Sequence, residues 1–188
     1  MKGLILTIII GIWSSLAGAQ GVRLSYDSFT VDFDTILRVP RHVEWSLCRS
    51  DLGKARRIPS WKFIAESSLG KKSSTSLDYL GSGFDRGHMC PAGDRTSSTS
   101  ACKATFIMTN VCPQVPSLNR GDWSRDESRT RAFVQGGHHV NIQAHAVYWR
   151  ADTMWIGRGR VAVPHGFVKT VRLAENDSII YSRYYPNN

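Results

Sequence analysis

The sequence predicts an α+β fold in one domain, with a mixed or antiparallel sheet at its core and one long helix. Several short segments alternate apolar and polar residues, which is typical of half-buried strands. Only one segment has the length and the ending of a long helix. The chain has 188 residues, 41% of them hydrophobic and 21% charged, so its composition is unlike that of a disordered, collagen-like or coiled-coil protein.

Residues 1–19 are expected to be a signal peptide. Lys2 provides a positive start, residues 4–13 are apolar apart from Thr7 and Gly11, and Ala17-Gly18-Ala19 is a small-residue cleavage signal. The alternative is a membrane anchor, but a spanning helix needs roughly 20 apolar residues. We therefore expect residues 20–188 to be exported to the periplasm or the medium, with no membrane attachment in the mature form.

The first half of this domain is expected to be irregular between its strands. Residues 20–50 should form two strands, one around Phe29 to Phe33 and one from His42 to Leu47. Residues 49–83 then read as a long basic loop, a kind of segment that is often functional. A short strand or extended turn at 84–94, a brief helix at 97–103 and a compact strand at 104–109 follow. Pro113 and Pro116 indicate a loop after them.

The second half is expected to begin with the long helix, from about Leu118 to Gln135. Gly136-Gly137 is a typical C-terminal stop for it. Alternating and β-branched segments predict the remaining strands, near 139–148, 153–157, 161–163, 167–173 and 179–184.

The charge of the chain indicates a polyanionic partner. Lys and Arg number 24 and Asp and Glu 15, for a net charge of +9. Loss of Lys2 with the signal peptide leaves +8. An acidic protein surface would suit this charge, but nucleic acid is the commoner partner.

Four cysteines in an exported chain favour disulfide bonds. Cys48, Cys90, Cys102 and Cys112 allow three pairings, and the sequence does not choose between them. A zinc site is the alternative, and it is disfavoured because the chain has no C-x-x-C pair and no His at finger spacing.

One short segment, residues 85–94, concentrates reactive side chains. His88 titrates near neutrality and can take a proton from water. Arg86 lies two residues before it, on the same side of an extended chain, where a guanidinium could hold a phosphate oxygen. Gly87 would allow a phosphate backbone to approach. The alternative is a structural Asp85–Arg86 ion pair beside a half-buried histidine.

A second pattern lies on the predicted helix, where Asn119, Trp123, Glu127 and Arg131 are each four residues apart. Such a series forms one slanting stripe on a helix. An Asn carbonyl oxygen at its start can bind a hard divalent ion, and a Glu can hold the water shell of that ion. The alternative is an Asn cap with an exposed Glu–Arg pair.

Together these segments resemble the DNA/RNA non-specific endonuclease family of ββα-metal nucleases. The signature stretch is Asp85-Arg86-Gly87-His88-Met89 with Pro91-Ala92, and the resemblance covers roughly residues 40–185. It extends to Asn110, to Pro113-Gln114 and to the helix stripe. Cys90, Cys112 and Asp126 depart from the usual pattern without removing a catalytic residue.

The resemblance implies specific roles. His88 would be the general base, Arg86 would steady the transition state, and Asn119 would be the direct ligand of a hydrated Mg²⁺, with Mn²⁺ as an alternative ion. The other implied site residues support catalysis or bind phosphate: Asn110, Glu127, Arg131 and Arg57, for which Arg56 competes in a loosely matched loop.

The implied activity is hydrolysis of both DNA and RNA to 5′-phosphate ends, with binding mainly to the phosphate backbone. Trp45, Trp61 and Trp123 could stack on bases, although a core position is commoner for Trp. Two alternatives stay open: a nucleic-acid-binding module without catalysis, and an exported interaction protein that reuses the scaffold. The sequence does not indicate an oligomeric state.

Overall fold

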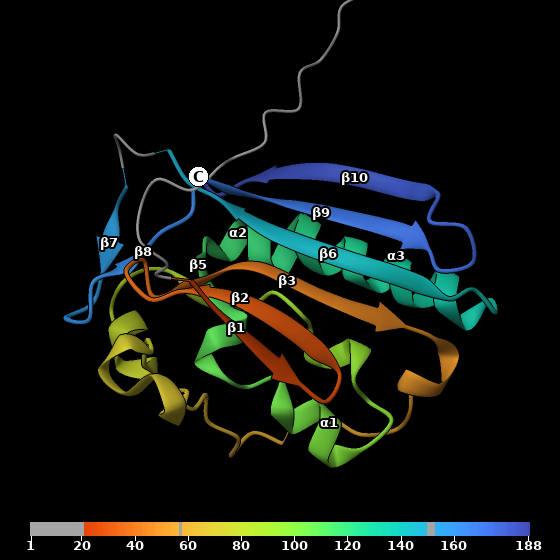
Figure 1. Ribbon diagram of the computed structural model, residues 1–188, viewed down its shortest axis with the longest axis horizontal. Helices are drawn as coiled ribbons and strands as arrows, with labels where there is room; N and C mark the ends of the chain where they lie inside the picture. The colour runs from red at the N-terminus through yellow and green to blue at the C-terminus, as the bar shows by residue number, and fades with distance from the viewer. Residues whose placement is uncertain (1–20, 57, 150–152) are drawn as a thin grey trace, which may run out of the picture.

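The computed structural model describes residues 21–56, 58–149 and 153–188. Its main sheet has six strands in the order β1-β2-β3-β6-β9-β10, and every neighbouring pair is antiparallel (Figure 1). The bounds are β1 (Gly21–Tyr26), β2 (Phe29–Asp34), β3 (Val39–Leu47), β6 (Val140–Val147), β9 (Gly166–Leu173) and β10 (Ile179–Pro186). The predicted α+β fold is confirmed, and β1 is a strand that the sequence analysis missed.

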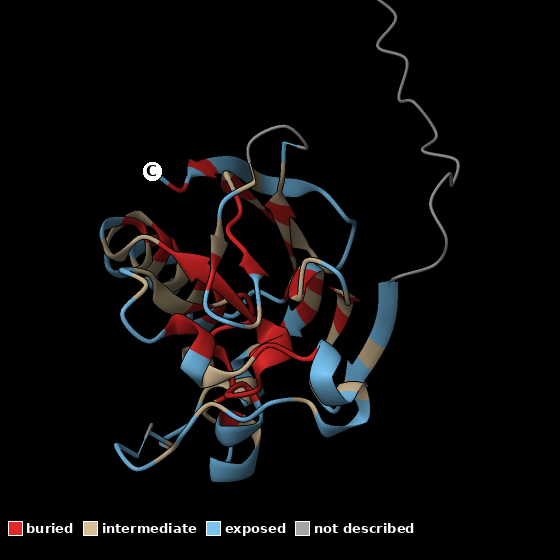
Figure 2. Cartoon of the chain, turned by 90° about the vertical axis from the view of Figure 1, so that its left-hand side faces the viewer, coloured by how far each residue is buried: buried red, intermediate tan, exposed pale blue. Residues whose placement is uncertain are grey.

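Side chains of this sheet alternate between two faces, as a pleated strand requires. β2 and β6 both alternate buried and half-buried residues along their length. Val31, Phe33, Val43 and Ile142 are at most 2% exposed and belong to the core. The long helix lies against one face of the sheet, behind β6 and β9 in Figure 1, and buried residues gather where the elements pack together (Figure 2). The opposite face of the sheet carries the polar residues that alternate with the core residues along the strands.

The predicted long helix is confirmed and is built from three consecutive pieces. These are α2 (Pro116–Leu118), a π-helical turn (Asn119–Trp123) and α3 (Ser124–Gln135). Pro116 stands in the first turn, where its missing N–H costs nothing. The π turn contains Gly121, whose backbone is not helical (φ −104°, ψ −111°). Single π turns of this kind inside α-helices are frequent at functional sites.

A separate pair of strands precedes this helix: β4 (Asp85–His88) and β5 (Val111–Gln114). The prediction of a strand at 104–109 is wrong. That apolar run contains the end of α1 (Thr99–Ala104) and the start of a 3₁₀ turn (Met108–Asn110), and burial of Phe106 and Met108 explains its composition without a strand. Pro113 lies inside β5, which has one partner only, and a strand edge tolerates proline.

The rest of the described chain contains short elements. Residues 49–56 and 58–83 form three 3₁₀ turns joined by loops, as predicted for a basic loop, with one isolated bridge from Ile64 to Ile107. β7 (Trp155–Ile156) and β8 (Val161–Ala162) form a small hairpin. In the described residues, the helices fall short of the length and apolar character needed to cross a membrane. The expected signal peptide lies outside the described residues.

All four cysteines are free thiols in the structure, so the expected disulfide bonds are not present in it. Cys90 and Cys112 are fully buried, and Cys112 Sγ lies 3.6 Å from the carbonyl oxygen of Pro40. Burial raises the pKa of both thiols far above the usual value. These cysteines serve as small apolar core residues, a role that free Cys commonly has.

Candidate active site

The candidate site is built around the short strand β4, which pairs with β5 in the register Asp85↔Gln114, Gly87↔Cys112 and His88↔Val111. Gly87 is required by close packing. A Cβ built on Gly87 would lie 2.1 Å from Oε1 of Gln114. Both polar atoms of the Gln114 side chain are buried and have no hydrogen-bond partner among the described residues. Buried amides of this kind are commonly satisfied by water or by a bound group.

The first residue of β4 holds the start of the helix. Nδ2 of Asn119 donates to Oδ2 of Asp85 at 2.9 Å. Arg120 binds the same carboxylate through two nitrogens, at 2.8 and 2.7 Å. Hydrogen bonds from Arg120 and Asn119 lower the pKa of Asp85, so this carboxylate is ionised at neutral pH. The hydrogen bond to Asp85 uses the amide nitrogen of Asn119, which leaves its carbonyl oxygen on the other side of the amide.

His88, the last residue of β4, stands among aromatic rings. Its imidazole lies 5.1 Å from the ring of Phe63 and 4.9 Å, edge to face, from that of Phe106. Phe63 and Phe106 also contact one another at 5.1 Å. These rings restrict the orientation of the imidazole and lower the polarity around it.

Arg86 is placed by neighbours outside β4. Its Nε donates to Oγ of Ser76 at 2.9 Å, and its guanidinium lies 5.8 Å from the centre of the Phe63 ring. Phe63 thus contacts both Arg86 and His88. The structure accordingly brings the predicted cation and the predicted base to one aromatic side chain, as their spacing of two residues on a strand indicates.

Asn110 makes its contacts with the backbone. Its Oδ1 accepts from the N–H of Cys90 at 2.9 Å, and its Nδ2 donates to the carbonyl oxygens of Cys90 and Thr105 at 2.9 and 3.0 Å. The side chain is fully buried. Asn110 therefore fixes the chain just after His88, which differs from the expected place beside a metal-bound water or a phosphate.

Glu127 and Arg131 belong to a buried group of charges on α3. Arg131 binds Asp94 at 3.0 Å and lies 3.9 Å from Glu127, and Asp94 also accepts from Nε1 of Trp45 at 3.0 Å. Burial raises the pKa of Glu127 to about 7, although the positive charges of Lys169 and Arg131 act to lower it. Glu127 can therefore exchange a proton near neutrality.

Lys169, on β9, is the second cation of this group and is 2% exposed. Its Nζ lies 3.5 Å from the centre of the Trp123 ring, a cation–π contact. Burial lowers the pKa of Lys169, while the neighbouring carboxylates of Glu127 and Asp94 oppose this shift. Trp123 itself is 1% exposed and is a core residue, as is Trp45 at 5%, so neither can stack on a base.

A divalent cation fits these residues if most of its ligands are water. No three His, Cys, Asp or Glu side chains are grouped to hold a metal in the part of the chain that the structure describes. The donor that β4 and the helix present is the amide oxygen of Asn119, with the nearby carboxylate of Asp85 fixed by hydrogen bonds. Mg²⁺ keeps several waters and uses few protein ligands, so this donor set suits it.

Three residues that support the site were given no role from the sequence. Asp94 and Lys169 support Glu127 and Arg131, and Ser76 positions Arg86. Asp94 belongs to the segment 85–94, and Lys169 is a Lys within the predicted strand at 167–173, where a cation indicates a buried ion pair. Arg57, which was expected to bind phosphate, lies outside the described residues.

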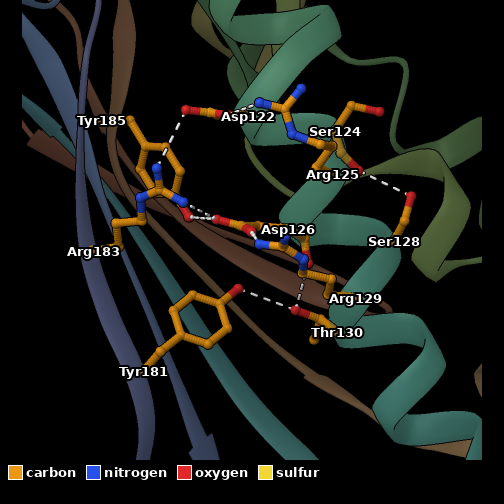
Figure 3. A network of polar contacts seen from close by, with 10 residues as sticks. All are labelled: Asp122, Ser124, Arg125, Asp126, Ser128, Arg129, Thr130, Tyr181, Arg183 and Tyr185. Atoms are coloured by element: carbon orange, nitrogen blue, oxygen red, sulfur yellow. Dashed lines mark hydrogen bonds and ion pairs between the residues drawn. The ribbon is translucent and has the colours of Figure 1, made fainter.

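The other side of α3 carries a second polar network (Figure 3). Asp126, which is 5% exposed, accepts from Tyr185 at 2.5 Å and from Arg183 at 3.1 Å, both on β10, and from Arg129 at 2.9 Å. Its carboxylate points to β10, away from the cluster around Glu127. Asp126 thus ties the edge strand of the sheet to the helix of the candidate site.

The residue after β10 attaches to the start of the same helix. Asn187 is 7% exposed, and its Oδ1 accepts from the N–H of Val115 at 2.8 Å. Its Nδ2 donates to the carbonyl oxygens of Pro113 and Pro164 at 3.0 and 2.8 Å. The junction between β5 and α2 is therefore fixed by a residue far along the chain.

Comparison with known proteins relates the chain to nucleases. The model of the DNA/RNA non-specific endonuclease family matches residues 14–188. A nuclease of Nostoc sp. is 40% identical over 135 residues, which is 68% of this chain and 49% of that protein. Mitochondrial endonuclease G of Homo sapiens is 35% identical over 121 residues, 60% of this chain and 41% of that protein.

A solved structure shares the fold. A chain in the crystal structure of the EndoG/EndoGI complex, which addresses EndoG inhibition, superposes with a TM-score of 0.79 at 26% identity, covering 88% of this chain and 74% of that one. The present chain spans about half the length of the curated relatives that it matches, 49% and 46% for two of them.

Proposed function

We propose, from the premise that the chain belongs to the DNA/RNA non-specific endonuclease family, that it hydrolyses phosphodiester bonds of DNA and RNA. One observation carries the proposal: β4, four residues long, presents His88 at one end and holds the helix residue Asn119 through Asp85 at the other. The net charge of +9 supports a polyanionic substrate.

In this proposal His88 takes a proton from the attacking water. The water oxygen bonds to phosphorus, the bond between phosphorus and the 3′ oxygen breaks, and the 3′ oxygen takes up a proton from water, so the products carry a 5′-phosphate and a 3′-hydroxyl. No 2′-hydroxyl takes part, and both DNA and RNA are therefore substrates. The rings of Phe63 and Phe106 hold the imidazole in place and reduce its contact with bulk solvent.

Arg86 binds a non-bridging phosphate oxygen in this scheme, with its Nε anchored on Ser76. Nη1 of Arg131 donates to Asp94 at 3.0 Å, and its Nη2 donates to Ser128 at 3.1 Å. We assign Arg131 two roles: it holds Glu127 in place, and it contributes positive electrostatic potential to the site. Asn110 acts through the backbone that follows His88.

Asn119 would hold a hydrated Mg²⁺, for which Mn²⁺ could substitute, and Glu127 would accept hydrogen bonds from its water shell. Such an ion stabilises the negative charge that develops on the phosphate and on the leaving oxygen. The hydrogen bond from Asn119 to Asp85 orients the amide so that its oxygen serves as the ligand.

The deciding experiment is a cleavage assay on plasmid DNA and on RNA, with Mg²⁺ and with EDTA. We expect cutting of both substrates, loss of cutting in EDTA, and a loss of at least about 100-fold in His88→Ala. The exposed imidazole of His139 provides the matched control, because His139→Ala should cut like the wild type.

Three results would overturn the proposal or one of its parts. If His88→Ala cuts as fast as the wild type, His88 is not the base. If the protein shifts nucleic acid in a gel but gives no product at millimolar Mg²⁺, it is a binding module. The absence of any salt-dependent affinity would indicate an interaction protein.

We further propose that residues 1–19 direct export and are then removed, so that the enzyme acts in the periplasm or the medium without a membrane anchor. The support is the pattern of Lys2, the apolar run at 4–13 and Ala17-Gly18-Ala19. Fractionation of expressing cells and N-terminal sequencing test it. A cytosolic protein that retains Met1 would refute this proposal.

A further inference from the structure

The polar face of the main sheet carries a pair of histidines that the nuclease chemistry does not use. His42 on β3 and His145 on β6 are direct partners in the strand register. β3 and β6 are the two central strands of the six. Cross-strand partners have Cβ atoms about 4.5–5.5 Å apart, so both imidazoles rise from one rigid position.

The imidazole rings of this pair are in contact through their nitrogen atoms. Nδ1 of His42 lies within hydrogen-bond distance of both ring nitrogens of His145, at 3.0 Å from Nδ1 and 3.2 Å from Nε2. Metal–imidazole bonds of about 2.0–2.1 Å place two nitrogens about 2.9 Å apart at a right angle and about 3.4 Å apart at a tetrahedral angle. The two rings are therefore as close as one shared ion requires, and such an ion would replace this contact once the His145 ring turns one nitrogen toward it.

The other nitrogen of His42 faces a carboxylate. Its Nε2 lies 3.4 Å from Oε2 of Glu44. Metal-binding histidines usually donate their second N–H to a carboxylate, which fixes the tautomer and makes the ligand nitrogen more basic. Glu44 is therefore in the place of an orienting partner and not of a third ligand, in agreement with the lack of a group of three ligands among the described residues.

Glu44 is held in place by the neighbouring strands. It accepts from Arg23 on β1 and from Thr30 on β2, the latter at 3.0 Å. Asp32 stands opposite His42 on β2 and also pairs with Arg23, at 3.1 Å. The imidazole pair therefore has two carboxylates and one guanidinium beside it.

We propose that His42 and His145 form a binding site for a divalent transition metal of the Cu²⁺ and Zn²⁺ class, with water at the remaining positions. Imidazole nitrogen suits these ions, whereas Mg²⁺ prefers oxygen ligands. The site lies on the polar face of the sheet, and it is independent of the proposed nuclease activity. A bound ion would link β3 to β6.

The test is a Cu²⁺ titration of the full-length protein at pH 7.5 in EDTA-free buffer, monitored by calorimetry and by electron paramagnetic resonance. The wild type should bind one equivalent of Cu²⁺, and its resonance spectrum should show two nitrogen ligands. His88→Ala, which removes the imidazole of the candidate active site, should bind in the same way. His145→Ala should bind at least about 10-fold more weakly, with one nitrogen ligand.

Glu44→Gln supplies a second measurement that keeps both imidazoles, and its affinity should fall by about 10-fold or more. Circular dichroism confirms that each variant is folded, and cleavage of DNA in Mg²⁺ by His145→Ala should match the wild type. The proposal is overturned if His145→Ala binds Cu²⁺ as tightly as the wild type, or if the wild type shows only weak binding at millimolar Cu²⁺.

Discussion

Asn119 and Asp85 are 34 residues apart in the chain, and a hydrogen bond of 2.9 Å joins their side chains. It connects β4 to the π turn in the long helix, just after α2. The bond also determines which atom of the Asn119 amide is available to a cation. The orientation of one side chain therefore depends on a carboxylate that is not itself a proposed ligand.

Asp85→Ala should weaken the proposed Mg²⁺ site. Without the carboxylate, the Asn119 amide loses its fixed orientation, and partners of this kind typically affect metal affinity by 10–100-fold. We expect the Mg²⁺ concentration for half-maximal cleavage to rise by about 10-fold or more. Arg120→Ala is the control, because the side chain of Arg120 is 72% exposed and its loss leaves the hydrogen bond of Asn119 intact. Equal Mg²⁺ dependence in the two variants would contradict this role.

Asn110→Ala should act mainly on stability. The substitution leaves the N–H and C=O of Cys90 and the C=O of Thr105 without their buried partner. Each unsatisfied buried group costs about 1–3 kcal/mol, so we expect a loss of about 3 kcal/mol or more in the free energy of unfolding. Urea denaturation measures it. If the variant unfolds like the wild type but loses activity, Asn110 acts directly on the reaction.

Gly87→Ala should disrupt the contact of β4 with β5, because the new methyl would overlap the side chain of Gln114. Overpacking of this kind typically costs about 1–3 kcal/mol. Thermal melts measure the loss, and cleavage should fall as His88 moves with the strand. Gly21→Ala is the matched control, since a Cβ there would come no closer than 3.9 Å to another atom. A stable and active Gly87→Ala variant would refute the tight packing at β4.

Glu127→Gln should change the pH dependence of stability. Burial raises the pKa of Glu127 to about 7 in the folded protein, from the ordinary value of 4.5 that it has in the unfolded chain. Between these values the folded state keeps a proton that the unfolded state has released, so this group lowers stability as pH rises from 4.5 through 7. Glutamine cannot ionise and removes the effect.

Melting curves in EDTA at pH 5 and pH 8 test this sign. The melting temperature of Glu127→Gln, relative to that of the wild type, should be several degrees higher at pH 8 than at pH 5, because each kcal/mol of stability corresponds to about 2–4 °C. The cleavage activity of this variant in Mg²⁺ should fall at both pH values. Glu175→Gln, at an exposed position, is the control and should show no such pH dependence. A constant difference in melting temperature would contradict the raised pKa.

Local patterns predicted the parts of the fold that local physics determines. The alternation at Phe29–Asp34 and the ending at Gly136-Gly137 predicted β2 and the end of α3. The apolar run at 104–109 misled, because a buried irregular segment and a strand have the same composition. β5 was missed since Pro113 usually indicates a loop, and here it occupies a strand with one free edge.

The candidate site followed mainly from the family resemblance, and what the sequence could not provide was contact between distant residues. No spacing rule connects Asp94 to Arg131, or Lys169 to Glu127, because tertiary packing alone brings them together. The same holds for His42 and His145, which are 103 residues apart and are brought together by the register of β3 and β6.

The contacts of Asn187 have a practical bearing on any altered form of this protein. This side chain joins the segment after β10 to the N–H of Val115, the residue before α2, and the next turn of the helix carries Asn119. Loss or replacement of Asn187 would therefore disturb the entry to the helix. Variants for enzymology should keep Asn187 in its native surroundings.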